Sequence, residues 1–154
     1  VGHSSFTATG GSILSNAGDM FYVTNTTSTI SLTNVALTLS NDTLLNVAGN
    51  SSSRGWGTAG ANGGTCTFTV SNQILTGNIL VDSISSLDFQ LSDGSVFTGA
   101  IYPTGAAGTV NVTLGSGCQW VLTGDSYITS YTGDVSNIVT NGYTVYVNGT
   151  AITD

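Results

Sequence analysis

Three segments of alternating apolar and polar residues recur along the chain at nearly equal spacing. They are residues 66–70 (CTFTV), 87–91 (LDFQL) and 110–114 (VNVTL). A turn, a short apolar segment, a Thr-Gly step and a third apolar piece follow each of them, with the steps at residues 76–77, 98–99 and 123–124. A repeat of about 22 residues that carries three short strands predicts a β-solenoid, in which every turn stacks on its neighbours.

The alternation also predicts the core of the solenoid. Successive side chains of a strand point to opposite faces, so Cys66, Phe68 and Val70 should face inward. The equivalent apolar residues of the next two repeats should stack on them in columns: Leu87, Phe89 and Leu91, then Val110, Val112 and Leu114.

An earlier turn fits the repeat less regularly. Val35, Leu37 and Leu39 are expected to face inward in a strand that precedes Cys66 by more than one repeat length. We assign the excess length to residues 49–64, a Gly-rich insertion that should leave the solenoid as a loop.

The two ends of the chain carry the signals of caps, which a solenoid needs to cover its exposed strand edges. Residues 143–147 and 150–152 flank Asn148-Gly149, a strong two-residue hairpin signal, and should close the C-terminal end. Residues 10–24 are expected to begin the stack at the other end. The single proline, Pro103, should lie between repeats, where its missing N–H costs no ladder bond.

Composition agrees with an all-β fold. Thr, Ser, Asn and Gly supply 79 of the 154 residues, whereas Glu and Lys, which favour helices, are absent. With 40% hydrophobic and only 6% charged residues, the chain is not of the disordered class. We therefore predict one domain over residues 1–154, a single right-handed parallel β-helix of five to six turns with terminal caps.

The net charge of the chain limits the classes of partner that it is expected to bind. The formal net charge is −7 and the only Lys or Arg is Arg54, so neither nucleic acid nor an anionic membrane surface is an expected partner. No apolar run approaches the roughly 18 residues of a membrane-spanning helix, and the N-terminus lacks the layout of a signal peptide. We expect a fragment or mature domain cut from a longer chain, monomeric within that larger multidomain chain, in an extracellular setting.

Several runs resemble domains of large secreted, adhesin-like surface proteins of Gram-positive anaerobic bacteria. They are residues 19–23 (DMFYV), 50–57 (NSSSRGWG), 81–84 (VDSI), 97–101 (FTGAI) and 123–127 (TGDSY). In those proteins a parallel β-helix lies beside Ig-like modules and wall anchors and is often labelled carbohydrate-binding. The resemblance implies a non-catalytic, secreted or cell-surface domain, and it supplies no site residues.

The Gly-rich insertion holds the main candidate site. Arg54 and Trp56 lie two residues apart, so a sugar ring could stack on the indole while the guanidinium bonds a hydroxyl or carboxylate. The competing interpretation is structural, with Trp56 folded onto a groove of the solenoid and Arg54 paired with an Asp. Residues 55–60 formally match G-x-G-x-x-G, but no strand precedes and no helix follows, so no cofactor is predicted.

The remaining reactive side chains give weaker signals. Cys66 belongs to an inward column and Cys118 lies about two turns away, near 10 Å at roughly 4.8 Å per turn, so we expect two reduced thiols. The eight Asp show no calcium-binding spacing, and no metal site is predicted. A Thr array that could bind ice is interrupted by Asp88, Gln90 and Asn111. Hydrolysis by two carboxylates alone stays open in principle, but we expect no enzyme.

Two functions remain in competition. The first is a stable, non-catalytic spacer or display module of a surface protein. The second is a carbohydrate-binding module that takes host or environmental glycans through Arg54 and Trp56, with help from tyrosines such as Tyr102 or Tyr131. A buried Trp56 would favour the spacer, and a solvent-facing Trp56 beside a groove would favour binding.

Overall fold

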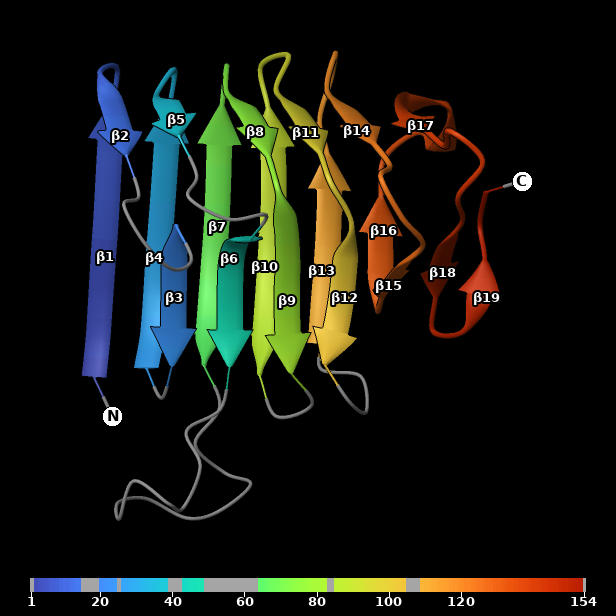
Figure 1. The fold of residues 1–154 in the computed structure, drawn as a ribbon, viewed down its shortest axis with the longest axis horizontal. Helices are drawn as coiled ribbons and strands as arrows, with labels where there is room; N and C mark the ends of the chain where they lie inside the picture. The colour runs from blue at the N-terminus through green and yellow to red at the C-terminus, as the bar shows by residue number, and fades with distance from the viewer. Residues whose placement is uncertain are drawn as a thin grey trace.

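A computed structural model of the chain shows a β-solenoid of about five turns, with about 23 residues in each turn. The structure describes residues 2–14, 20–24, 26–38, 43–48, 64–82, 85–104 and 109–153. In Figure 1 the strands of the rear sheet run upward and those in front run downward while the chain advances toward the C-terminus, so the coil is right-handed. The predicted right-handed parallel β-helix is confirmed.

Each turn contributes one strand to each of three faces. The first face is an uninterrupted six-stranded parallel sheet that contains the longest strands: β1 (Gly2–Thr9), β4 (Thr26–Thr33), β7 (Thr65–Ser71), β10 (Ser86–Ser92), β13 (Thr109–Leu114) and β16 (Ser130–Thr132). The second face holds mainly three-residue strands: β2 (Ser12–Leu14), β5 (Ala36–Thr38), β8 (Ile74–Thr76), β11 (Val96–Thr98), β14 (Gln119–Val121) and β17 (Ile138–Val139). The third face holds β3 (Phe21–Thr24), β6 (Thr43–Ala48), β9 (Asn78–Asp82), β12 (Ile101–Thr104), β15 (Ser126–Ile128) and β18 (Val145–Val147).

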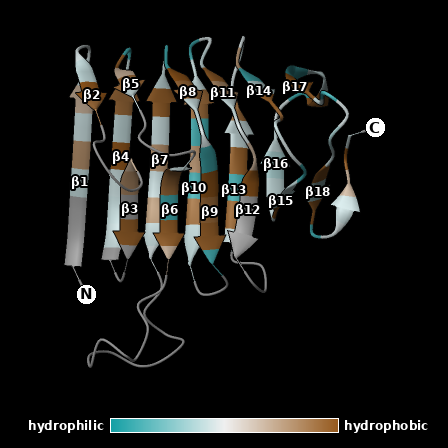
Figure 2. Ribbon diagram, viewed as in Figure 1, coloured by the Kyte–Doolittle hydropathy of each residue, from teal (hydrophilic) through white to brown (hydrophobic). Residues whose placement is uncertain are grey.

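The predicted core columns are confirmed on the first face. Cys66 pairs with Leu87, which pairs with Val110, and the other two inward columns continue in the same register. The inward residues are buried and the intervening Thr, Asp, Gln and Asn residues face outward, which produces the alternating bands along these strands in Figure 2. Because parallel strands at equal register place like residues on top of one another, the alternation of one turn fixes the core of the next.

Aromatic rings form a continuous series inside the solenoid. Phe21, Phe68, Phe89, Phe97 and Trp120 follow one another with ring centroids 5.2–6.0 Å apart, and Phe68 and Phe89 are stacked. The indole N–H of the fully buried Trp120 donates to the carbonyl of Gly99 at 3.0 Å. The series therefore joins the first, third, fourth and fifth turns, and the buried indole keeps a hydrogen bond.

The corner between the first and second faces is a column of left-handed residues. In the first four turns the residue directly after the long strand has a positive φ: Gly10, Asn34, Asn72 and Asp93, at 48° to 68°. Glycine, Asn and Asp are the residues that adopt this conformation at the least cost. The composition rich in Asn and Gly thus reflects a sharp corner that recurs from turn to turn.

The structure corrects the predicted start of the stack and the placement of its second turn. The solenoid begins with β1 at Gly2, so residues 10–24 do not open it. Val35 and Leu37 do face the core as predicted, but they do not precede Cys66 on the first face. Cys66 pairs with Ser28 of β4, whereas Val35 lies at the corner and Leu37 belongs to β5 on the second face. Leu39 and residues 49–63 lie outside the described residues. The prediction failed because β4 alternates Ser and Thr with only two large apolar residues, Ile30 and Leu32.

Two of the three faces contain a break in the strand ladder. On the third face the β3–β12 sheet ends before β15, and the amide of Ile101 donates instead to the hydroxyl of Ser126 at 2.9 Å. Alternate residues of a strand direct their N–H groups to the same side. The backbone nitrogen of Pro103 therefore points toward the following turn, as the amide of Ile101 does. Pro103 lies within β12 rather than between repeats, at the strand edge where its missing N–H is tolerated.

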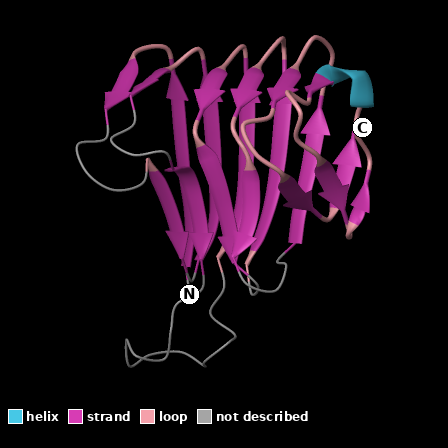
Figure 3. Ribbon diagram, turned by 45° about the vertical axis from the view of Figure 1, so that its right-hand side comes forward, coloured by secondary structure: helices cyan, strands magenta, loops and turns pink. Residues whose placement is uncertain are grey.

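The C-terminal end is closed, and the N-terminal end of the described stack is open. β18 and β19 (Thr150–Ala151) form the predicted antiparallel hairpin around Asn148-Gly149, beside the 3₁₀ turn Val135–Asn137 that is cyan in Figure 3. At the other end β1 pairs with β4 alone among the described strands, and Phe6 and Phe21 border a hollow of about 410 Å³. Among the described residues, no helix has the length and apolar character that crossing a membrane requires.

Candidate functional site

The two residues predicted to bind glycans, Arg54 and Trp56, lie outside the described residues. Glycan binding by the Gly-rich loop therefore stays a prediction. Gly64, at the end of that insertion, is buried in the solenoid, where its amide donates to the hydroxyl of Ser85 at 3.1 Å.

Of the two additional tyrosines considered from the sequence, Tyr131 serves the fold. Its ring packs partly against the core, and its hydroxyl donates to the backbone carbonyl of Asp134 at 2.8 Å. Burial, together with the negative charge of Asp134, raises the pKa of Tyr131 to about 12. Tyr131 therefore holds β16 against the C-terminal cap, and the side chain of Tyr102 lies outside the described part of the chain.

Both cysteines are free and buried, as predicted from their separation along the solenoid. Burial raises the pKa of the Cys66 thiol to about 12, because the surrounding core does not solvate a thiolate. A thiol of this kind is a small core residue and a poor nucleophile.

Three aspartates of the described turns bond to the backbone or to a neighbouring hydroxyl. Asp134 accepts the amide of Ser136 at 2.9 Å, which lowers the pKa of its carboxyl group, and Asp125 accepts the amide of Thr144 at 2.9 Å. The carboxylate of Asp93 accepts the hydroxyl of Ser71. Within the described ranges, no three His, Cys, Asp or Glu side chains gather in a way that could hold a metal ion.

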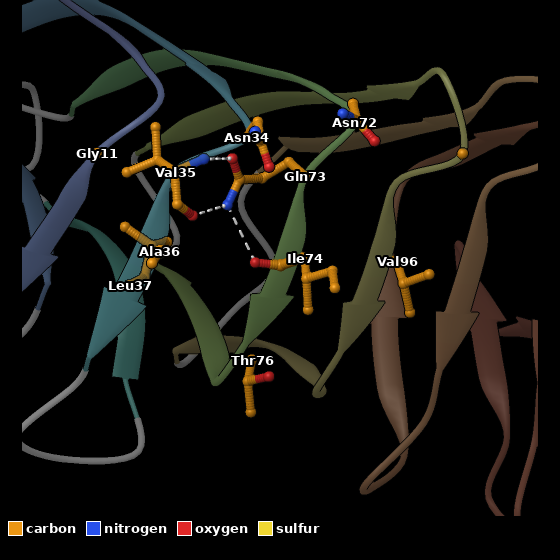
Figure 4. A pocket seen from close by; sticks show the side chains of 11 residues that line it. Gly11, Asn34, Val35, Ala36, Leu37, Asn72, Gln73, Ile74, Thr76 and Val96 are labelled. Carbon is orange, nitrogen blue, oxygen red and sulfur yellow. Dashed lines mark hydrogen bonds between the residues drawn. The ribbon is translucent and has the colours of Figure 1, made fainter.

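A large hollow lies where the second-face ladder is interrupted. β2 and β5 form one short sheet, β8 begins the next, and a hollow of about 730 Å³ lies over the break. Figure 4 shows Asn34, Val35 and Leu37 on one side and Asn72, Gln73 and Ile74 on the other. None of its described lining residues is titratable, so they offer no acid or base that could activate the hydroxyl of Thr76.

The side chain of Gln73 replaces a missing pair of ladder bonds at this break. It is 1% exposed, its oxygen accepts the amide of Val35 at 2.8 Å, and its nitrogen donates to the carbonyls of Val35 and Ile74 at 2.6 and 3.1 Å (Figure 4). The side-chain amide thus offers Val35 the same donor and acceptor that a neighbouring strand would offer. We assign this hollow a structural role, because the polar atoms of its buried glutamine are already used.

A second concave surface lies at the C-terminal end of the third face and is aromatic. Tyr127 of β15 pairs in register with Tyr146 of β18, and their rings are stacked with centroids 5.0 Å apart and planes 9° apart. The two rings line a groove of about 450 Å³ together with Thr109 and Asn148. Sequence analysis missed this pair, although each tyrosine occupies the middle, outward position of a short strand that follows a polar turn.

Comparison of the chain with protein-family models, with curated proteins and with solved structures finds no match. The candidate sites therefore stand on the geometry of this chain alone. The Gln73 hollow is explained by the fold, whereas the tyrosine groove has exposed groups that the fold does not use.

Proposed function

We propose that this chain is a non-catalytic structural module of a secreted or cell-surface protein, a stiff spacer that holds other parts of a larger chain apart. The observation that carries the proposal is the unbroken six-stranded sheet of the first face, in which every turn is bonded to the next. The internal aromatic series adds dense packing along the same axis. Stacked turns of this kind resist bending because each is bonded to its neighbours along the whole of the first face.

Polar side chains support the same proposal by maintaining contact between turns where the backbone ladder is interrupted. Gln73 bonds to Val35 across one break and Ser126 bonds to Ile101 across the other. The hydroxyl of Ser95 accepts the amide of Gln73, which links the third and fourth turns at the same corner. Buried polar groups that are satisfied in this way favour one arrangement of the turns over others.

The adhesin-like context that the sequence resembles belongs to the same proposal.

Mechanical unfolding tests the proposal directly. The chain would be tethered between two Ig-like reference domains and pulled from its two ends. A spacer should stay folded until after the reference domains unfold, because each turn is held to the next by the ladder of the first face and by the packed core. Turn-by-turn unravelling at forces below those of the reference domains would refute a load-bearing role.

A further inference from the structure

The tyrosine groove at the C-terminal end combines flat aromatic surface with exposed polar groups. Tyr127 is 44% exposed even though its ring stacks on Tyr146, so a large part of the pair faces solvent. Thr109 and Asn148, which line the same groove, are both exposed. The hydroxyl of Thr109 and the carboxamide of Asn148 therefore lie beside the rings and are accessible to a ligand.

The groove is held in shape by bonds between turns. The amide of Ser126 donates to the carbonyl of Thr144 at 2.9 Å, and the amide of Thr144 donates to the carboxylate of Asp125 at 2.9 Å. At the other end of the same strands, the amide of Asn148 donates to the carbonyl of Ile128 at 3.0 Å. The two tyrosines thus stand on strands fixed at both ends, which lowers the ordering cost of binding.

These groups match the chemistry of a sugar ring. A pyranose presents apolar C–H groups on its faces, which pack against aromatic rings, and hydroxyls around its rim, which bond to amides and hydroxyls. The groove volume of about 450 Å³ lies within the range of ligand sites, roughly 300–1,000 Å³.

Charge decides which sugars fit. The carboxylate of Asp125 precedes β15 by one residue, the formal net charge is −7, and the only Lys or Arg of the sequence is Arg54, which is not among the described residues. Uronic, sulfated or sialylated sugars would therefore meet unfavourable charge at this groove. A neutral oligosaccharide would not.

We propose that the groove formed by Tyr127, Tyr146, Thr109 and Asn148 binds neutral oligosaccharides, with a pyranose ring packed on the tyrosines and its hydroxyls bonded to Asn148 and Thr109. This site is separate from the Gly-rich loop and from the spacer function. A spacer can carry it or lack it. The competing explanation is that the tyrosine pair only stabilises the last two turns.

The experiment is a binding screen followed by NMR titration of the labelled chain. Cellohexaose, xylohexaose, mannohexaose, chitohexaose and lacto-N-tetraose serve as neutral probes, and trigalacturonic acid and 3′-sialyllactose as acidic ones. We expect at least one neutral probe to shift the amide resonances of residues 109, 127–129 and 146–149, and the acidic probes to leave them unchanged. If no neutral probe binds at millimolar concentration, the proposal is overturned.

Variants separate a binding site from a structural pair. Tyr127→Ala and Tyr146→Ala should each weaken binding at least tenfold, whereas Tyr127→Phe keeps the ring and should stay within about threefold of the wild type. Tyr143→Ala removes a tyrosine that is 39% exposed but not in the groove, and should leave binding unchanged. Each variant is first checked for a native amide spectrum.

Two further variants test the groove with a mild substitution and test whether the Gly-rich loop binds the sugar instead. Asn148→Gly retains the positive φ of the turn, removes the carboxamide and should weaken binding severalfold without disturbing β18 and β19. Trp56→Ala should bind as the wild type does. Binding that is lost in Trp56→Ala and kept in Tyr127→Ala and Tyr146→Ala would overturn the proposal and place the site in the Gly-rich loop.

Discussion

Replacing Gln73 by methionine removes three hydrogen bonds, two of them buried, while nearly preserving the length of the side chain. The amide and the carbonyl of Val35, a residue that is 4% exposed, lose the partner they have in Gln73. Leaving a buried backbone group unsatisfied costs about 1–3 kcal/mol, so the two groups together cost about 2–6 kcal/mol. The apolar thioether recovers about 1 kcal/mol by burial. We expect the free energy of unfolding to fall by about 3 kcal/mol.

Chemical denaturation measures this change, with Gln90→Met as the matched control. Gln90 is exposed on the first face and bonds to the side chain of Asp88, so its replacement should alter the stability by less than about 0.5 kcal/mol. For a chain of this size, about 3 kcal/mol corresponds to a decrease in Tm of about 6–12 °C. If Gln73→Met matches Gln90→Met, the glutamine does not bridge the break between β5 and β8, and the argument fails.

Three further predictions concern the core and its titratable groups. Gly99→Ala should destabilise the chain by at least about 3 kcal/mol in thermal unfolding, because its Cβ would collide with a backbone carbonyl of the preceding turn. In the control Gly94→Ala the new Cβ meets no atom, so this variant should lose only the roughly 1–2 kcal/mol that its positive φ costs. Equal losses in the two variants would contradict this packing. Ellman's reagent at pH 8 should find no reactive thiol in the native chain and two after denaturation, since both cysteines are buried and the pKa of Cys66 is raised to about 12; rapid native labelling would disprove the burial. Tm should be nearly constant from pH 5 to pH 9. Tm should fall below about pH 4, because the folded chain lowers the pKa of Asp134 and loses that stabilisation when the carboxylate is protonated. It should fall again as the pH rises toward 12, because the folded chain raises the pKa values of Cys66 and Tyr131 and keeps both groups protonated. A drop of tens of degrees between pH 7 and pH 5 would contradict this account.

The regular part of the fold was predictable because its determinants are local. Cys66, Leu87 and Val110 each begin an alternating segment at nearly equal spacing, and equal spacing between stacked strands leaves one register that buries the apolar side chains. The C-terminal hairpin followed in the same way from Asn148-Gly149, whose residues adopt the positive φ values that the turn requires.

The irregular turns were not predictable from the same pattern. On the first face, Ser28 of the second turn pairs with Cys66 of the third across much more than one repeat length, and β4 has fewer large apolar residues than the segment that follows it. The sequence prediction therefore moved Val35 and Leu37 onto the wrong face. What fixes the observed pairing includes the bond from Gln73 to Val35, which joins residues 38 positions apart and has no local signature.

Strand alternation and turn chemistry act over a few residues, so the class of fold, the direction of the side chains and the core of the repeats could be deduced from the amino-acid sequence alone. Three features could not: which strands pair across turns of unequal length, where the ladder breaks, and that Tyr127 lies on Tyr146. Those features depend on tertiary contacts between residues 19 or more positions apart. At outward positions burial imposes no pattern on the sequence, so the tyrosine groove becomes visible only once the turns are stacked.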